Sequence, residues 1–215
     1  MSGRFITLEG IEGAGKSTVA QALVRALEAR GIVVRATREP GGTPLAERLR
    51  DAVLTKGEET VSPEAETMLM FASRAVHLDN LVRPALARGE WVICDRYTDA
   101  TRAYQGGGRG VAREFIETLA QAVHRGTEPD LTLLLDLPVE IGLERARRRR
   151  VANGQVVADR FESETLEFFG RVRNRYLDIA KSEPARVHVL DATRDPVQVA
   201  AAASAALDAL IGRST

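Results

Sequence analysis

Residues 10–17 read Gly-Ile-Glu-Gly-Ala-Gly-Lys-Ser, which matches the phosphate-loop pattern G-x-x-x-x-G-K-[ST] at every fixed position. The mostly apolar run Arg4–Leu8 before it is typical of a β-strand, and the Ala- and Leu-rich residues after it are typical of a helix. A glycine-rich turn can precede a helix by chance, but this context favours a loop whose N–H groups hold phosphate oxygens at the positive end of a helix. The sequence therefore predicts a nucleoside triphosphate site, formed by Gly10, Ile11, Glu12, Gly13, Ala14, Gly15, Lys16, Ser17 and Thr18.

Three side chains of this loop have chemistry that predicts a role. The Lys16 ammonium is expected to reach the β- and γ-phosphates, and the Ser17 hydroxyl to ligate Mg²⁺. Glu12 is unusual, because a carboxylate that faced the phosphates would be repelled by them. It is therefore expected to point away, toward a hydroxyl of a second substrate, although a solvent-facing position agrees equally well with the loop alone.

The composition indicates one domain, residues 1–215, and argues against several classes of protein. The chain is 44% hydrophobic and 28% charged, and its 30 basic residues balance 30 acidic ones, so no net field directs it to nucleic acid or a membrane. The single cysteine, Cys94, excludes an intramolecular disulfide, and the three histidines have no metal-ligand spacing. Since the sequence shows no signal peptide or transmembrane run, we expect a cytoplasmic protein without nucleic-acid or membrane partners.

Short apolar runs alternate with longer amphipathic segments, which is typical of a parallel sheet with helices on both faces. The predicted strands, whose near-continuous hydrophobicity indicates burial on both faces, are Arg4–Leu8, Ile32–Thr37, Trp91–Cys94, Leu131–Leu135 and Val187–Leu190. Helices are predicted near residues 16–30, 44–55, 63–88, 111–124, 139–150, 163–182 and 195–211, with boundary residues at Gly31, Ser62-Pro63 and Asp195-Pro196. The predicted fold class is α/β, with five parallel strands.

The third predicted strand ends in a second pair of candidate residues. Asp95 stands at the carboxyl end of a buried strand beside the phosphate loop, where an acid can hold magnesium water. Arg96 has a planar guanidinium that can grip a phosphate. Asp136, which ends the fourth predicted strand, is an alternative acid, but Pro138 close by favours a turn or helix-capping role for it.

Three further segments are candidates for the pocket of a second substrate. Residues 38–43 follow the second predicted strand, at the sheet edge where α/β proteins bind ligands, although the stretch is also a plain Pro-Gly turn. Phe71 and Arg74 share a helix face and can meet one ligand, although such pairs are more often a core ring beside a solvated arginine. Residues 101–105 precede three glycines, 106–108, which we expect to form a mobile or tightly turned segment rather than a regular element.

Taken together, these segments resemble the thymidylate kinases over nearly the whole chain. The phosphate loop alone indicates only P-loop proteins, whereas the combination of segments is highly specific. The resemblance is carried by Leu8–Thr18, Arg38–Thr43, Phe71–Arg74, Asp95–Tyr97, Ala103–Arg109 and Asp159–Glu162. It implies a P-loop nucleoside monophosphate kinase fold with a lid near 145–160, a homodimer, and transfer of the γ-phosphoryl of ATP to dTMP with Mg²⁺, giving dTDP and ADP in dTTP biosynthesis.

The resemblance also implies how dTMP is recognised. Phe71 would stack on the thymine ring, and Arg74 would donate a hydrogen bond to a thymine carbonyl. Gln105 with Thr101 would help to recognise the base. Tyr104 would pack beneath the sugar where a 2′-hydroxyl would clash, which gives a preference for deoxyribose.

For the remaining groups, the resemblance implies that Arg38 and Arg96 hold the monophosphate. Asp95 would organise magnesium or the acceptor phosphate. Glu12 would meet the sugar 3′-hydroxyl, which decides between the two positions that the loop alone leaves open.

Thymidylate kinases supply a charge-neutralising arginine either in the phosphate loop, at the position of Gly13, or in the lid. This chain resembles the second form, since its predicted lid carries Arg145, Arg147, Arg148, Arg149 and Arg150. Arginines are also common on solvated helix faces, but the missing loop arginine favours a role in transition-state charge. We expect Arg147 with Arg149 or Arg150 to contact ATP, because they lie nearer to residues 151–158, a stretch longer than the family pattern.

Two other classes of function compete with this interpretation. Among enzymes, the alternatives are another nucleoside monophosphate kinase and a deoxynucleoside kinase. A nucleoside kinase would need a base for a 5′-hydroxyl, whereas two acceptor-side arginines favour a phosphate as the acceptor. A GTPase-like switch usually carries D-x-x-G and N-K-x-D after the phosphate loop, and the sequence contains neither.

Overall fold

The structure is a computed structural model in which residues 3–55, 57–154, 160–161 and 164–212 are described. Five parallel strands form one sheet in the order β2-β3-β1-β4-β5. Their bounds are β1 (Phe5–Glu9), β2 (Val34–Arg38), β3 (Trp91–Asp95), β4 (Leu131–Asp136) and β5 (Val187–Asp191). The predicted α/β fold with a five-stranded parallel sheet is therefore confirmed.

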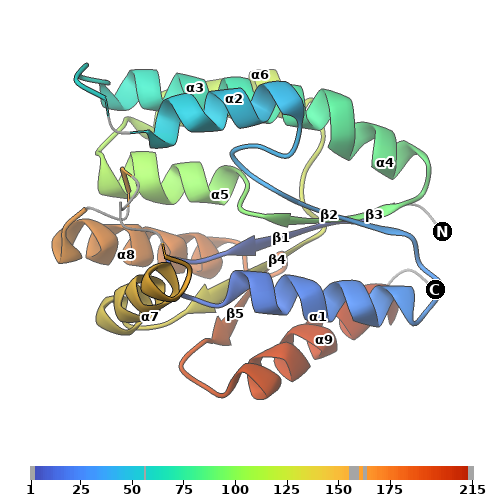
Figure 1. Ribbon diagram of the computed structural model, residues 1–215. Coiled ribbons are helices and arrows are strands. Elements are labelled where there is room, and N and C mark those ends of the chain that lie inside the picture. The colour runs from blue at the N-terminus through green and yellow to red at the C-terminus, as the bar shows by residue number, and fades with distance from the viewer. Residues whose placement is uncertain (1–2, 56, 155–159, 162–163, 213–215) are drawn as a thin grey trace.

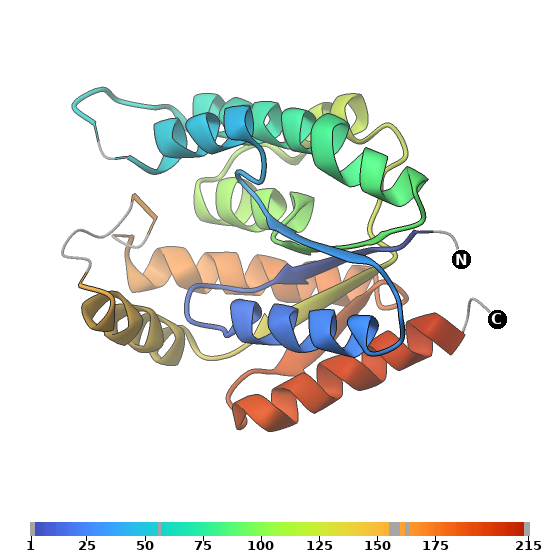
Figure 2. The same cartoon turned by 45° about the vertical axis from the view of Figure 1, so that its right-hand side comes forward.

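Helices cover both sides of this sheet (Figure 1). On one side, α1 (Lys16–Glu28) and α9 (Pro196–Gly212) lie next to each other, and on the other side lie α2 (Pro44–Leu54), α3 (Pro63–His77) and α4 (Arg83–Ala87). The remaining helices are α5 (Thr98–Thr101), α6 (Arg113–His124), α7 (Val139–Ala152) and α8 (Leu166–Ser182). In the turned view, the start of β1 and the end of α9 lie on the same side of the molecule (Figure 2). Within the described ranges, no helix is both long enough and apolar enough to cross a membrane.

Burial of the strands depends on their place in the sheet. All five side chains of β1 are buried, as are nearly all of β3 and β4. The edge strands β2 and β5 are partly exposed, so the prediction of burial on both faces is wrong for these two. An edge strand has a neighbour on one side only, and the hydrophobicity of an isolated run does not indicate its position in the sheet.

Helix boundaries follow the local signals. The Ser62 hydroxyl caps α3 by accepting a hydrogen bond from Ala65 N at 3.1 Å, and Asp195 accepts one from Val197 N at 2.8 Å before α9. The predicted helix 63–88 is interrupted by one π-helical turn, Leu78–Val82, after which α4 begins. The interruption ends two residues before Pro84, which has no N–H for a helical hydrogen bond.

The three glycines of residues 106–108 are the main error of the sequence-based fold prediction. The structure has a regular element here, since α5 continues into a π-helical turn over Arg102–Gly108. A Cβ on Gly107 would lie 2.7 Å from Arg175 Cβ, and one on Gly108 would lie 2.4 Å from the Phe168 ring. The glycines therefore allow a close approach to α8, a long-range reason that a local pattern cannot show.

Candidate active site

The phosphate loop joins β1 to α1 as the pattern predicts. Gly10, Gly13 and Gly15 have φ angles of 134°, 73° and 92°, which favour glycine and let the backbone turn around a hollow at the start of α1. This hollow has a volume of about 260 Å³, and we call it the phosphate hollow. It is lined by Glu12, Gly13, Ala14, Gly15, Lys16, Ser17, Arg50, Asp95, Arg96 and Arg149.

Lys16 is the buried cation of the phosphate hollow. Its ammonium donates to the carbonyl oxygens of Gly10 at 3.0 Å and Ile11 at 3.1 Å. Burial, together with the nearby charge of Arg96, lowers the pKa of Lys16 to about 8. A bound anion would favour the charged ammonium and would raise this pKa again.

Asp95 and Ser17 meet in the same hollow and fit a divalent cation. The Oδ1 atom of Asp95 is buried and has no hydrogen-bond partner within the described ranges, so it lacks the compensation that a buried carboxylate oxygen needs. Ser17, which lines the same hollow, offers a hydroxyl oxygen. Carboxylate and hydroxyl oxygens are the ligands that Mg²⁺ prefers.

Arg96 follows Asp95 and lies between the phosphate hollow and a second cavity. It has a left-handed φ of 72°, which points its guanidinium back over the loop. The guanidinium donates to Gly10 O at 3.0 Å, to Glu12 Oε1 at 2.8 Å and to the hydroxyl oxygens of Tyr104 at 3.0 Å and Tyr176 at 3.2 Å. Because these acceptors are buried together with Arg96, their hydrogen bonds hold the guanidinium in one orientation.

Glu12 turns toward this arginine rather than toward solvent. Its second oxygen accepts a hydrogen bond from the Tyr104 hydroxyl at 2.7 Å, and only 15% of its side chain is exposed. The solvent-facing alternative therefore does not describe the structure. Glu12 lines both the phosphate hollow and the second cavity.

The second cavity has a volume of about 90 Å³, and we call it the acceptor cavity. It is lined by Glu12, Glu39, Pro40, Arg50, Leu54, Met70, Arg74, Arg96, Tyr97, Ala100, Thr101, Tyr104, Gln105 and Phe161. The cavity thus brings together with Glu12 five side chains that were predicted for the base, the sugar or the acceptor phosphate: Arg74, Arg96, Thr101, Tyr104 and Gln105.

Arg74 is the best-defined donor in this cavity. It donates to Glu39 Oε2 at 2.7 Å and to Tyr97 O and Thr101 Oγ1, both at 3.1 Å, while its buried Nη1 has no partner in the described part of the chain. Its guanidinium lies 4.7 Å from the Phe71 ring centre. Phe71 itself is buried behind Arg74 and does not line the cavity, so the structure does not place it where it would stack on a ligand.

The arginines expected at the acceptor phosphate lie differently from the prediction. Arg38 is half exposed, pairs with Glu47 at 2.8 Å and lines neither of the two hollows just described. Arg50, on α2, lines both of them and donates to Pro40 O at 2.8 Å. The sequence analysis missed Arg50, because a single arginine on an amphipathic helix has no local signal that distinguishes it from a solvated one.

The arginines of α7 divide between two environments. Arg149 lines the phosphate hollow, and Arg145 donates to Ala192 O at 2.8 Å beside the start of α1. Arg147 and Arg148 instead pair with Glu144 and are 61% and 76% exposed. The expectation that Arg147 reaches ATP is therefore not supported by its position, and Arg150 does not line the phosphate hollow either. Residues 155–159 of the predicted lid lie outside the described residues.

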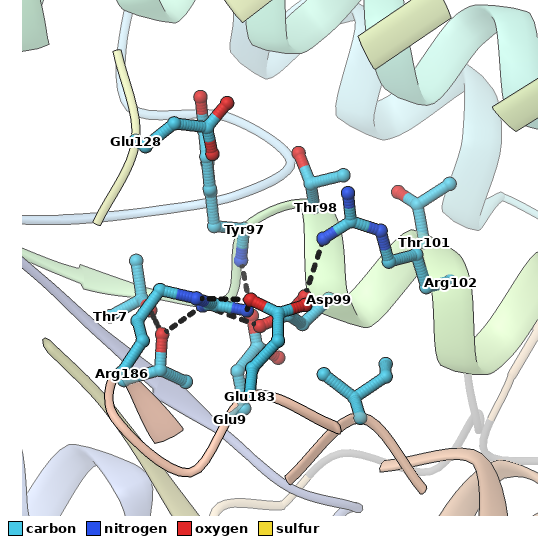
Figure 3. A network of polar contacts seen from close by, with 12 residues as sticks. Thr7, Glu9, Tyr97, Thr98, Asp99, Thr101, Arg102, Glu128, Glu183 and Arg186 are labelled. Carbon is cyan, nitrogen blue, oxygen red and sulfur yellow. Dashed lines mark hydrogen bonds and ion pairs between the residues drawn. The ribbon is translucent and has the colours of Figure 1, made fainter. Parts of the chain in front are cut away.

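A buried charge network lies beneath the site (Figure 3). Glu9 accepts from Tyr97 N at 2.7 Å, which holds the backbone next to Arg96, and Asp99 pairs with Arg102 at 2.9 Å and Arg186 at 2.8 Å. Burial, and then repulsion from Asp99, raise the pKa of Glu9 to about 8. The sequence analysis missed Glu9, although an acid directly after four mostly apolar strand residues was a usable signal.

Asp136 has neither the metal role nor the capping role considered from the sequence. Both of its carboxylate oxygens accept from Arg173, at 2.7 and 2.9 Å, in a two-pronged ion pair with α8. The residue before α7 is Pro138, and no side chain caps that helix.

Comparison with known proteins agrees with this geometry. The family model described as thymidylate kinase matches residues 8–203. A thymidylate kinase of Pseudomonas syringae is 54% identical over 211 residues, which cover 98% of this chain and 96% of the relative, and one of Methylococcus capsulatus is 50% identical over 209 residues, with 97% of both chains covered. The crystal structure of thymidylate kinase from Ehrlichia chaffeensis superposes with a TM-score of 0.76 at 31% identity and covers 97% of this chain and 99% of that one. The chain belongs to the thymidylate kinase family.

Proposed function

We propose that the protein transfers the γ-phosphoryl group of ATP to the phosphate of dTMP, giving dTDP and ADP. The observation that carries this proposal is that the phosphate hollow and the acceptor cavity share Glu12, Arg50 and Arg96. Two substrates bound in these hollows would meet at two guanidinium groups, which suits a transfer between two phosphates.

On the donor side, the loop amides and Lys16 would hold the β- and γ-phosphates of ATP. Mg²⁺, when bound by Ser17 and Asp95, would neutralise phosphate charge. The unpartnered Asp95 oxygen supports this assignment.

On the acceptor side, Arg96 and Arg50 would hold the dTMP phosphate, and Arg50 replaces Arg38 in the role expected from the sequence. Arg74, Thr101 and Gln105 would meet the base. Tyr104 would lie beneath the sugar and Glu12 would accept from its 3′-hydroxyl. Phe161, which lines the acceptor cavity, would lie beside the base in the place expected for Phe71.

The reaction needs no protein nucleophile. An oxygen of the dTMP phosphate attacks the γ-phosphorus, and the bond from that phosphorus to the bridging oxygen of ADP breaks. The protein positions the two phosphates, neutralises charge and excludes water. Arg149 is the α7 arginine placed to neutralise charge in the phosphate hollow.

An acceptor screen tests this proposal. ADP formation from ATP is measured with dTMP, dUMP, UMP, CMP, GMP or AMP, and without an acceptor. We expect dTMP to give the largest kcat/KM. A higher value for a purine or for a cytosine nucleotide would contradict the proposal, as would equal rates with and without acceptor, which would indicate a hydrolysing switch.

We also propose that the protein forms a homodimer in the cytoplasm through faces of its long helices. Leu45 on α2 and Met68 on α3 are large apolar side chains that are 43% and 49% exposed, and the two helices are neighbours (Figure 1). Sedimentation analysis tests the oligomeric state. A monomer at micromolar concentration would contradict it, and Leu45→Glu with Met68→Glu is expected to weaken the dimer.

A further inference from the structure

Glu66, on α3, is a fully buried carboxylate to which neither the family resemblance nor the proposed reaction gives a role. Its Oε1 atom accepts from Gln105 Nε2 at 2.8 Å and lies 3.4 Å from Arg109 Nε, and its Oε2 atom lies 3.1 Å from Arg160 Nη2. Burying an acid among two arginines and an amide does not favour stability over a well-packed apolar cluster. The contact with Gln105 indicates what this acid does.

The Glu66 carboxylate determines which way the Gln105 amide faces. A carboxylate held between two guanidinium groups offers acceptors only, so the amide has to present its nitrogen to Glu66. The Gln105 carbonyl oxygen then points the other way and has no hydrogen-bond partner within the described ranges. Gln105 lines the acceptor cavity, so this oxygen is available to accept a hydrogen bond from a ligand bound there.

Arg74 provides the complementary group in the same cavity. Its Nη1 is a buried donor without a partner among the described residues. A donor and an acceptor in one cavity complement a base edge that carries a C4 carbonyl next to an N3–H group, as in thymine and uracil. Cytosine has the opposite arrangement, an amino donor next to a ring acceptor, and would leave both protein groups opposed by a group of the same kind.

We infer that Glu66 is a positioning residue for base selection: by binding the Gln105 nitrogen it commits the Gln105 oxygen to a base with an N3–H group. This inference rests on the proposed function, in which the acceptor cavity holds the base of the monophosphate. Glu66 touches neither base nor phosphate in this account and acts only through Gln105.

The test compares two acceptors that differ only at the base edge, dTMP and 5-methyl-dCMP. In Glu66→Gln, residue 66 can donate as well as accept, so the Gln105 amide is free to turn over and to donate to the cytosine ring nitrogen. The ratio of kcat/KM for dTMP to kcat/KM for 5-methyl-dCMP is expected to fall by at least about fivefold, which corresponds to one ordinary hydrogen bond. A general loss of folded enzyme lowers both values equally and leaves the ratio unchanged.

The matched control is Glu64→Gln, an exposed acid on the same helix with the same loss of charge, for which the wild-type ratio is expected. Because Glu66→Gln removes the negative charge beside the partly exposed Arg109 and Arg160, the double variant Glu66→Gln with Arg160→Gln is measured as well. The double variant removes one negative and one positive charge together, and Arg109 keeps its ion pair with Glu164 at 2.7 Å. The same fall in the ratio is expected.

Gln105→Ala separates this inference from the proposed function. If Gln105→Ala leaves the ratio unchanged, the acceptor cavity does not recognise the base through Gln105, and the proposed site assignment fails. If Gln105→Ala lowers the ratio while both Glu66 variants keep the wild-type value, the inference on Glu66 is overturned and the proposed function stands.

Discussion

The backbones of Gly13 and Gly142 approach so closely that a Cβ on Gly13 would lie 1.9 Å from the Gly142 carbonyl oxygen. The contact presses α7 against the phosphate loop. It leaves no room for an arginine side chain at position 13, which is where one form of the family carries its charge-neutralising arginine. The same contact places α7 beside the phosphate hollow, which Arg149 lines, so the lack of room for an arginine at position 13 and the approach of Arg149 have one structural cause.

Gly13→Ala is expected to destabilise the protein more than Gly31→Ala. Both glycines have nearly the same φ, 73° and 72°, but a Cβ on Gly31 meets nothing within 4 Å. The strain of a left-handed alanine, about 1 kcal/mol, is therefore common to both, and only Gly13→Ala adds a clash with the backbone of α7. Denaturant unfolding should show an additional loss of at least about 1 kcal/mol for Gly13→Ala. Equal losses would mean that α7 does not pack on the loop as described.

Binding of ATP is expected to take up a proton above pH 8. The pKa of Lys16 is lowered to about 8 without ligand, and phosphate charge raises it, so a fraction of the lysine gains a proton on binding at pH 8.5 but not at pH 6.5. Calorimetric titration in buffers of different ionisation enthalpy measures this uptake. Lys16→Ala should abolish it and lower kcat by at least about 10²-fold, whereas the exposed Lys181→Ala should do neither. Unchanged uptake in Lys16→Ala would assign the proton to another group.

Alanine substitution should separate the α7 arginines by environment. Arg149→Ala is expected to lower kcat by roughly 10²-fold, because Arg149 lines the phosphate hollow and would act on transition-state charge. Arg148→Ala, which removes an exposed partner of Glu144, should change kcat by less than about twofold. A similar mild loss of kcat in both variants would indicate that the arginines act only through their combined long-range positive charge.

Glu9→Gln should change how stability depends on pH. The pKa of Glu9 is about 8 in the folded protein and near 4.5 in the unfolded chain, so the native state favours the protonated acid. Its contribution to stability is complete below about pH 4.5 and is lost as the pH rises toward 8. Glutamine has the shape of the protonated acid and does not ionise. The free energy of unfolding of Glu9→Gln, compared with the wild type, should therefore rise between pH 5 and pH 8, and a constant difference would show that Glu9 does not titrate in this range.

Much of the fold could be predicted because its signals are local. The phosphate loop, the apolar strands and caps such as Ser62 are encoded by neighbouring residues, and the structure has them where the sequence indicates. The helix over residues 98–108 could not be predicted, since its glycines are required by Phe168 and Arg175, about 60 residues further along the chain.

In the candidate site too, residues with a local sequence signal could be predicted, and residues whose role depends on long-range packing could not. Lys16 was found from the phosphate-loop motif, and Asp95 and Arg96 from their place at a strand end. The family resemblance added the roles of Tyr104 and Gln105. Arg50 and Glu66 were missed, because their importance arises from the packing of α2 and α3 on other elements. Arg38 and Arg147 were expected at the phosphates, but Glu47 and Glu144 pair with them at the surface.

The most direct test of the account is whether phosphoryl transfer and ADP formation are one event. With ATP labelled in the γ-phosphate, we predict that the label appears in dTDP in a one-to-one ratio with ADP when dTMP is present. Without an acceptor, ADP formation should be slower by at least about 10²-fold, because the acceptor phosphate provides the attacking oxygen and no nucleophile is then held beside the γ-phosphate. Label in inorganic phosphate, formed at the same rate with and without dTMP, would contradict the assignment of the two hollows to one kinase site.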